Sequence, residues 1–155
     1  MGNLLIGSYT AKLDKSGRLK IPEKFRAAIE ADYGRDVFIT SLTDDSVHVY
    51  PLSVWTALSG VTNEGAIHFR PDVRQFMLNV NSKGAAGEID SKGRVLINLP
   101  LREQARLQQE VMVIGLTNHL EVWNKTLLDE KLQGKPLTDK DFENIARIMS
   151  PGKDE

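Results

Sequence analysis

The pattern Asp-x-x-Gly-Arg occurs twice in the chain, beginning at Asp14 and at Asp90. Gly17 and Gly93 can adopt a positive φ at no steric cost, and an aspartate three residues earlier can accept hydrogen bonds from the backbone of a turn. The spacing therefore predicts a tight hairpin turn in each copy, structured by these aspartates and glycines. An arginine that directly follows such a turn stands at the start of a strand.

Arg18 and Arg94 are the two arginines in this position. A guanidinium can hold a phosphate group or the O6/N7 edge of guanine through two parallel hydrogen bonds, and a two-stranded hairpin is narrow enough to enter the major groove of DNA. The alternative is an exposed strand residue that pairs with the nearby aspartate. Two arginines in matching frames favour DNA contact. Candidate phosphate contacts, with a solvated surface as the alternative role, are Lys15, Lys20 and Lys92.

The charge of the chain is unevenly distributed. Its 155 residues carry a formal net charge of −1, although a simple DNA-binding domain usually has a basic excess. Residues 1–26 and 81–106 together contain eleven basic and five acidic side chains, a net charge of +6, and the remainder carries −7. Both Asp-x-x-Gly-Arg patterns lie in these basic segments, which favours a polyanionic partner.

Other chemistries fit these residues poorly. Paired aspartates are the catalytic groups of aspartic proteases, but those sites need aspartate two residues before glycine and next to a small hydroxyl residue. Here aspartate stands three residues before glycine. The histidines lack metal-ligand spacing, cysteine is absent, and the chain has no glycine-rich phosphate loop. We therefore expect no enzymatic activity, no cofactor, no metal and no small-molecule substrate.

An internal duplication relates the two basic segments. Residues 13–21 align with residues 89–97 at an offset of 76 without a gap, and Arg26 falls on Arg102 at the same offset. Ordered similarity of this kind across half a chain indicates two copies of one unit. Further aligned pairs, at offsets of 74 and 73, are residues 37–43 with 111–117 and residues 47–50 with 120–123.

Each unit is expected to contain a strand, a turn, a strand, a short helix, a strand, a turn and a strand. In the first unit Pro22 ends the second strand and suits the first position of a helix, in which Phe25, Ala28 and Ile29 form one apolar stripe. Four short strands do not close a stable core alone. We therefore expect the strands of the two units to interleave in one merged core.

The rest of the chain is expected to be mainly helical. In the C-terminal part, Thr138 and Asp141 have capping-box spacing before an amphipathic helix, and residues 151–155 are expected to be a frayed tail. Residues 79–87 are expected to be the most flexible stretch, because asparagine, serine and glycine concentrate there. The expected domains are a first repeat (residues 5–55), a helical connector (56–81), a second repeat (82–126) and a C-terminal helical extension (127–155).

Five motif-bearing segments follow one another in a fixed order: Gly7-Ser8-Tyr9; Leu13-Asp14-x-x-Gly17-Arg18-Leu19-x-Ile21-Pro22-x-x-Phe25-Arg26; Val49-Tyr50-Pro51-Leu52-x-x-Trp55; Ile89-Asp90-x-x-Gly93-Arg94-Val95-Leu96-Ile97-x-x-x-Leu101-Arg102; and Glu121-Val122-Trp123. Over residues 5–132 this order resembles the MraZ family, and two Asp-x-x-Gly-Arg turns in register make the resemblance specific. The family usually has lysine directly before the turn glycine. Lys92 keeps this feature, whereas Ser16 stands there in the first repeat.

The resemblance implies a β-rich α+β fold of the AbrB/SpoVT type, in which two swapped-hairpin units merge into one pseudo-two-fold β-barrel with peripheral helices. It also implies a ring-like homo-oligomer. Members of the family are transcriptional regulators that bind direct repeats of double-stranded DNA upstream of the division and cell-wall gene cluster. Their DNA-contacting arginine is the last residue of an Asp-x-x-x-Arg motif, which carries over to Arg18 and Arg94.

Our interpretation of the sequence is a sequence-specific DNA-binding transcriptional regulator in the cytoplasm, associated with the nucleoid. The apolar patch at residues 4–6 is too short for a signal peptide or a membrane span, so we expect no membrane partner. The alternative is a non-catalytic oligomeric assembly or partner-binding protein that has lost DNA recognition. Ser16 and the acidic remainder of the chain leave this alternative open.

Overall fold

The computed structural model describes residues 4–150 of the chain. Contacts divide the chain into a first unit that ends at Lys125 and a second unit that begins at Thr126. The strands are β1 (Leu5–Lys12), β2 (Arg18–Lys20), β3 (Asp36–Thr40), β4 (Val47–Pro51), β5 (Ala85–Glu88), β6 (Arg94–Leu96), β7 (Glu110–Thr117) and β8 (Leu120–Trp123). The helices are α1 (Glu23–Tyr33), α2 (Leu52–Val61), the 3-10 helix η1 (Gly65–Phe69), α3 (Pro71–Lys83), α4 (Leu99–Gln104), α5 (Lys125–Gly134) and α6 (Asp139–Ile148).

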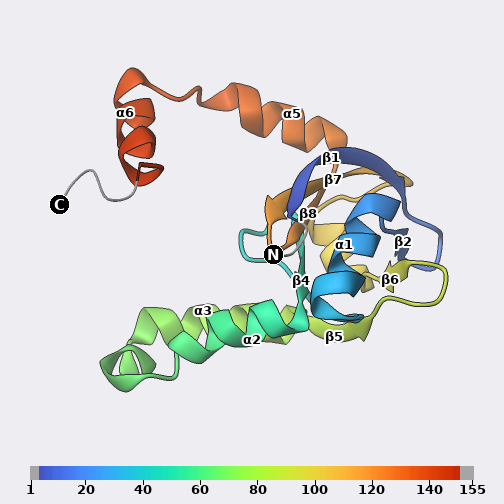
Figure 1. Cartoon of the computed structure of the whole chain (residues 1–155), viewed down its shortest axis with the longest axis horizontal. Helices are drawn as coiled ribbons and strands as arrows, with labels where there is room; N and C mark the ends of the chain where they lie inside the picture. The colour runs from blue at the N-terminus through green and yellow to red at the C-terminus, as the bar shows by residue number, and fades with distance from the viewer. Residues whose placement is uncertain (1–3, 151–155) are drawn as a thin grey trace. The chain divides into compact units, whose positions relative to one another are not determined.

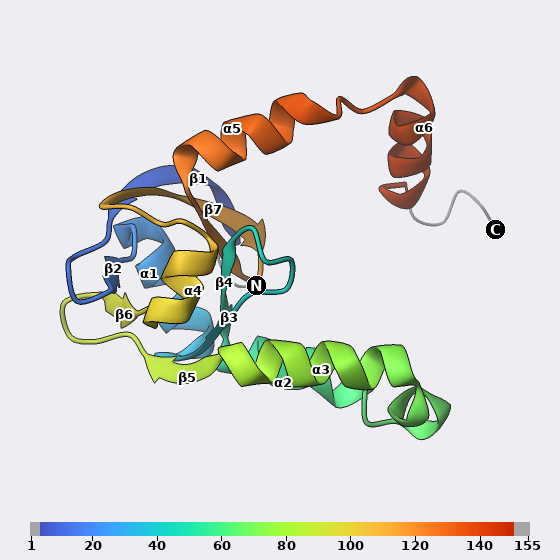
Figure 2. The same cartoon turned by 180° about the vertical axis from the view of Figure 1, so that it is seen from behind.

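The strands of the two repeats interleave in one antiparallel sheet with the order β1-β7-β8-β4-β3-β5 (Figure 1, Figure 2). β1 of the first repeat pairs with β7 of the second, and β5 of the second repeat pairs with β3 of the first in the equivalent register. The equivalent strands β4 and β8 pair with each other, with His48 opposite Glu121. The merged core expected from the duplication is therefore confirmed, because each repeat completes its sheet with strands of the other.

The predicted α+β class with helices around the sheet is confirmed, but the sheet is not the expected closed barrel. Within residues 4–150, β1 and β5 are its two edges and do not pair with each other. β2 and β6 form a separate two-stranded ribbon. Each of these strands is only three residues long and pairs with the other, so neither continues the ladder of the large sheet from β1 or β5.

The main hydrophobic core is built twice from equivalent positions. Ile21 and Ile97 follow the two ribbon strands and are completely buried. Phe25 on α1 and Leu101 on α4, which are equivalent at the offset of 76, are also buried in this core. Complete burial of a large apolar side chain stabilises a fold by about 1.5–3 kcal/mol, so these repeated positions hold each turn and its helix against the sheet. The apolar stripe predicted for the first helix is confirmed, because Phe25, Ala28 and Ile29 are its buried residues.

A second apolar cluster joins the connector helices to the sheet. Trp55 on α2 and Val80 on α3 pack with Phe38 and Tyr50 on β3 and β4. The Thr40 hydroxyl donates to the backbone carbonyl of Val80, at 2.6 Å. The prediction that residues 79–87 are flexible is therefore wrong. The segment forms the end of α3 and strand β5, because the buried Val80 anchors it.

The second unit contains most of α5, followed by α6. The capping box predicted for α6 is confirmed, since the Thr138 hydroxyl accepts from the Asp141 N–H and the Asp141 carboxylate accepts from the Thr138 N–H. The tail expected at residues 151–155 lies outside the described residues. Within residues 4–150 none of the helices combines the length and the apolar character that crossing a membrane requires.

Candidate nucleic-acid interface

The first Asp-x-x-Gly-Arg segment forms a closed turn between β1 and β2. The Gly17 N–H donates to the Asp14 carbonyl at 3.1 Å, and Gly17 has a φ of 93°. The Asp14 Oδ1 atom accepts from the backbone N–H groups of Ser16 and Arg18, at 3.0 and 2.9 Å. The carboxylate therefore bridges the turn and fixes the point at which the arginine leaves it.

The second segment forms the same turn between β5 and β6. The Gly93 N–H donates to the Asp90 carbonyl at 2.9 Å, and Gly93 has a φ of 79°. The Asp90 Oδ1 atom accepts from the backbone N–H groups of Lys92 and Arg94, at 2.8 and 2.9 Å. Both copies of the motif therefore share one backbone geometry despite their different turn side chains.

The turn aspartates are held in their charged form. The backbone N–H of Arg18, followed by the Ser16 hydroxyl, keeps the pKa of Asp14 below its usual value. The backbone N–H of Arg94 is the main cause of the lowered pKa of Asp90. Each turn thus presents a permanent carboxylate beside its arginine at neutral pH.

The β2–β6 ribbon connects the two turns, which stand at its opposite ends. Leu19 and Val95 pair at its centre and are 0% and 1% exposed, so this face of the ribbon lies against the core. Side chains alternate between the two faces of a strand. The opposite, outer face therefore carries the four remaining ribbon residues, in which Arg18 stands opposite Leu96 and Lys20 stands opposite Arg94.

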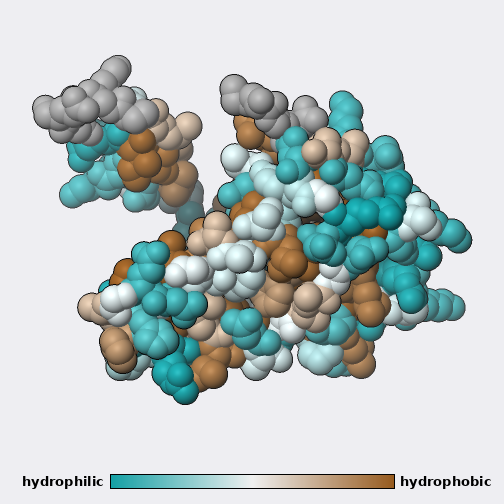
Figure 3. Space-filling model, turned by 60° about the horizontal axis from the view of Figure 1, so that its bottom comes forward, coloured by the Kyte–Doolittle hydropathy of each residue, from teal (hydrophilic) through white to brown (hydrophobic). Residues whose placement is uncertain are grey.

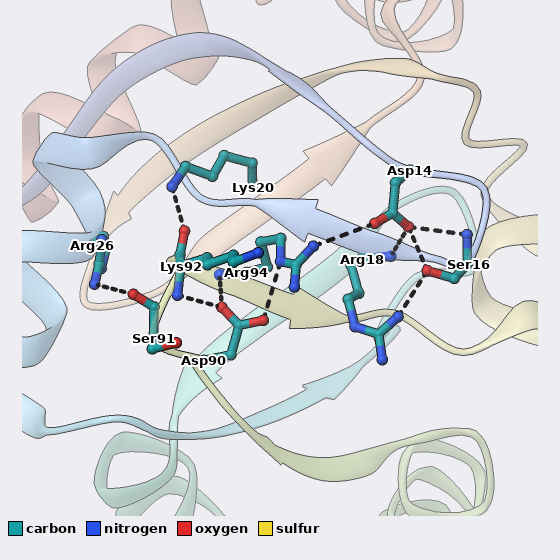
Figure 4. Close-up of polar contacts among 9 residues, drawn as sticks. All are labelled: Asp14, Ser16, Arg18, Lys20, Arg26, Asp90, Ser91, Lys92 and Arg94. Atoms are coloured by element: carbon teal, nitrogen blue, oxygen red, sulfur yellow. Dashed lines mark hydrogen bonds and ion pairs between the residues drawn. The ribbon is translucent and has the colours of Figure 1, made fainter.

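The two arginines have different partners on this face (Figure 4). The Arg94 Nε atom donates to Asp90 Oδ2 at 3.1 Å, and its Nη1 atom lies 3.9 Å from Asp14 Oδ2 of the other turn. The Arg18 Nη1 atom donates to the neutral hydroxyl of Ser16 at 2.8 Å. Both guanidinium groups are oriented by their turns and remain partly open to solvent.

The candidate lysines are exposed but are not gathered at one point. Lys20 donates through its ammonium group to the backbone carbonyl of Lys92, which brings these two residues together (Figure 4). Lys15 lies in the first turn, three residues before Arg18, at the other end of the ribbon. The structure thus spreads the cationic side chains along the ribbon and its two turns.

Two further arginines, at the equivalent positions 26 and 102, support the turns. Arg26 pairs with Glu23 and Glu30 of its own helix and donates from Nη2 to the Ser91 carbonyl of the opposite turn, at 3.3 Å. Its Cδ atom lies 2.8 Å from where a Cβ on Gly93 would stand. The ion pairs are therefore within one helix, and the contact between repeats is a hydrogen bond to backbone.

Arg102, the equivalent of Arg26, occupies the same place over the first turn. Its Nε atom donates to the Ile97 carbonyl at 2.8 Å and lies 2.7 Å from where a Cβ on Gly17 would stand. The equal spacing of Arg26 and Arg102 in the two repeats was the sequence signal for this shared role. Each turn is thus covered by an arginine from the helix that follows the opposite ribbon strand.

Titratable side chains also meet at the β4–β8 pairing, on the sheet. His48 Nε2 lies 3.3 Å from Glu121 Oε2, and the His48 side chain is almost completely buried. The His119 ring stacks on Tyr50, with 4.5 Å between ring centroids. No group of three or more His, Asp or Glu side chains within residues 4–150 is placed to hold a metal ion.

Comparison with known proteins identifies the family. The family model described as "MraZ protein, putative antitoxin-like" matches the chain twice, at residues 4–66 and 84–146. A protein of Acidobacterium capsulatum named transcriptional regulator MraZ is 32% identical over 92% of this chain and 97% of its own length. Proteins of the same name from Syntrophobacter fumaroxidans and Pediococcus pentosaceus are 32% and 29% identical, over 93% and 94% of this chain and 93% and 96% of their own lengths.

The chain belongs to the MraZ family of transcriptional regulators and contains two tandem MraZ domains. The resemblance found in the motifs is therefore confirmed, and so is the duplication. Membership of a family of transcriptional regulators also agrees with the expectation that the protein is not an enzyme.

Proposed function

We propose that the protein is a sequence-specific DNA-binding transcriptional regulator whose β2–β6 ribbon contacts double-stranded DNA. The single observation that carries the proposal is the outer face of this ribbon. It presents Arg18 and Arg94, one from each repeat, on the side away from the buried pair Leu19 and Val95. A two-stranded ribbon of this kind fits the major groove, where arginine binds guanine or phosphate with two hydrogen bonds.

The turns make this face suitable for recognition. The Ser16 hydroxyl and the Asp90 carboxylate hold the Arg18 and Arg94 guanidinium groups before DNA arrives, so less side-chain entropy is lost on binding. Lys15, Lys20 and Lys92 are exposed beside the arginines and are proposed to contact phosphates. Interleaving of the repeats supports the swapped-hairpin arrangement of the AbrB/SpoVT type.

We further propose that the protein acts as a ring-like homo-oligomer on tandem repeats upstream of the division and cell-wall gene cluster. The cationic surface of one protomer is small, and the net charge of the chain is −1. Linked weak sites on tandem DNA repeats gain affinity through effective concentration, which compensates for the small surface of each protomer. We also propose that the protein acts in the cytoplasm, associated with the nucleoid. The proposed domains are residues 5–55, 56–81, 82–126 and 127–155.

The test is the double variant Arg18→Ala/Arg94→Ala in fluorescence anisotropy titrations on a fragment of the DNA upstream of the chain's own gene. We expect binding to be lost while the circular dichroism spectrum and the melting temperature stay unchanged. Binding by the unaltered protein should also weaken steeply with salt, because each phosphate contact releases counterions and contributes about 0.9 to the slope of log affinity against log salt.

Arg74→Ala is the matched control. Arg74 is an exposed arginine on α3, remote from β2 and β6 (Figure 1), so the substitution removes one arginine side chain and its charge away from the ribbon. It should leave the affinity within about twofold. Equal affinities of the double variant and the unaltered protein would refute the role of the ribbon, and absence of binding by the unaltered protein would favour an assembly protein that has lost DNA recognition.

A further inference from the structure

The outer face of the ribbon differs at its two ends. Alignment at the offset of 76 makes Lys20 and Leu96 equivalent, so the duplication placed a cation at one end and an aliphatic side chain at the other. Leu96 stands opposite Arg18 and is 55% exposed. Lys20 stands opposite Arg94.

The charged groups around the two ends of the ribbon also differ. At one end Lys20, Lys92 and Arg94 lie together, tied by the hydrogen bond from the Lys20 ammonium to the Lys92 carbonyl. Arg94 pairs with Asp90 of its own turn at 3.1 Å and extends to within 3.9 Å of Asp14 of the other turn. At the other end the Arg18 guanidinium donates to the neutral hydroxyl of Ser16 (Figure 4), and its neighbour across the ribbon is Leu96.

An exposed leucine does not by itself indicate a binding site, because apolar side chains are scattered over the surface of folded proteins, as they are in Figure 3. The position of Leu96 is what matters. It lies on the outer face of the ribbon, across from Arg18, whose guanidinium donates to the neutral hydroxyl of Ser16. In the major groove the one apolar group on a base edge is the 5-methyl group of thymine.

We propose that Leu96 contacts a thymine methyl group in the major groove, beside the group that Arg18 holds, so that this end of the ribbon reads sequence. The opposite end, with Lys20, Lys92 and Arg94, anchors the DNA backbone. This inference rests on the proposed function. It gives the two ends of a symmetric ribbon different tasks, and so it gives one protomer a direction on DNA.

The test compares two DNA fragments that differ only in methyl groups. The DNA upstream of the chain's own gene is amplified once with thymidine and once with deoxyuridine throughout, and both products are titrated by fluorescence anisotropy. The unaltered protein should bind the thymidine fragment about fourfold tighter or more, since burying one group of methyl size favours binding by about that factor. Leu96→Ala should bind the two fragments equally, and Leu96→Ile should keep the preference.

Lys20→Ala is the matched control at the equivalent position. It should weaken binding to both fragments by the same factor and leave their ratio unchanged. If Leu96→Ala keeps the preference of the unaltered protein, the inference is wrong, and a change in oligomer size with an unchanged ratio would overturn it in favour of a subunit contact. If the unaltered protein binds neither fragment, it is the proposed function that fails.

Discussion

The two repeats face each other symmetrically at two places, the β2–β6 ribbon and the β4–β8 pairing, and they have diverged differently there. At the centre of the ribbon two apolar residues, Leu19 and Val95, face each other, and the Asp-x-x-Gly-Arg turn is kept in both copies. At the centre of β4–β8 the equivalent positions hold His48 and Glu121. Residues at such a centre face their own equivalents across the pairing.

This geometry explains the difference. Two buried glutamates facing each other would repel, and neither would find a donor. A histidine opposite a glutamate gives a complementary pair. His48 Nδ1 accepts from the Leu42 N–H, so Nε2 carries the proton and donates to Glu121. This hydrogen bond, with the one from Trp123, lowers the pKa of Glu121. A buried polar contact between equivalent positions therefore requires unlike residues, whereas a buried apolar contact, such as Leu19 with Val95, tolerates like ones.

The largest expected effect comes from breaking the buried pair. Glu121→Ala removes the acceptor of the His48 ring, of the Trp123 indole N–H at 2.8 Å and of the Ser46 hydroxyl at 3.4 Å. The free energy of unfolding, measured by urea denaturation, should fall by about 2–4 kcal/mol, because buried donors lose their partner. Glu143→Ala, at an exposed position on α6, should change it by less than about 0.5 kcal/mol.

The next effect concerns the turn. Gly93→Ala should lower the free energy of unfolding by about 1–2 kcal/mol, because a φ of 79° disfavours alanine and the new Cβ would stand 2.8 Å from Arg26 Cδ. Gly87→Ala on β5 is the control, since its Cβ would meet Val37 at an ordinary 3.9 Å. Equal melting temperatures for the two variants would contradict the role given to the turn.

The stability contributed by His119, beside the β4–β8 pairing, should be lost at a higher pH than the stability contributed by the turn aspartates of the ribbon. Burial, with the nearby His48, lowers the pKa of His119 below 6.5, so the folded protein binds this proton less readily than the unfolded chain. Stability from this residue is complete above about pH 6.5 and is lost as the pH falls through the lower, folded pKa. The stability that Asp14 and Asp90 contribute through their lowered pKa values is complete above pH 3.8 and is lost only in more acidic solution. Urea denaturation between pH 7.5 and 5 should show a decline that His119→Gln reduces.

The smallest effect on stability is expected for Ser16→Lys, which gives the first turn the lysine that the second has at Lys92. Ser16 is exposed, so the free energy of unfolding should change by less than about 0.5 kcal/mol. If the turn lies on DNA, one added phosphate contact should steepen the slope of log affinity against log salt by about 0.9. An unchanged slope would place Ser16 away from the DNA backbone.

The sequence alone was sufficient for the duplication, the turns, the helix stripe of Phe25 and the capping box of Thr138. These features depend on neighbouring residues or on similarity between the repeats, so local patterns report them. The family followed from the same motifs. The merged sheet also followed, because four short strands lack a core of their own.

Other features were decided only by the tertiary structure. Residues 79–87 have the composition of a loop, but burial of Val80 overrides it, and the short β2 and β6 leave the sheet open where a barrel was expected. The cover of Gly17 by Arg102 and the place of Leu96 opposite Arg18 depend on strand register between the repeats. Register is set by packing between distant segments. The Asp-x-x-Gly-Arg motif and the Ser16/Lys92 difference are thus visible in the sequence, whereas the different partners of Arg18 and Arg94 are visible only in the tertiary structure.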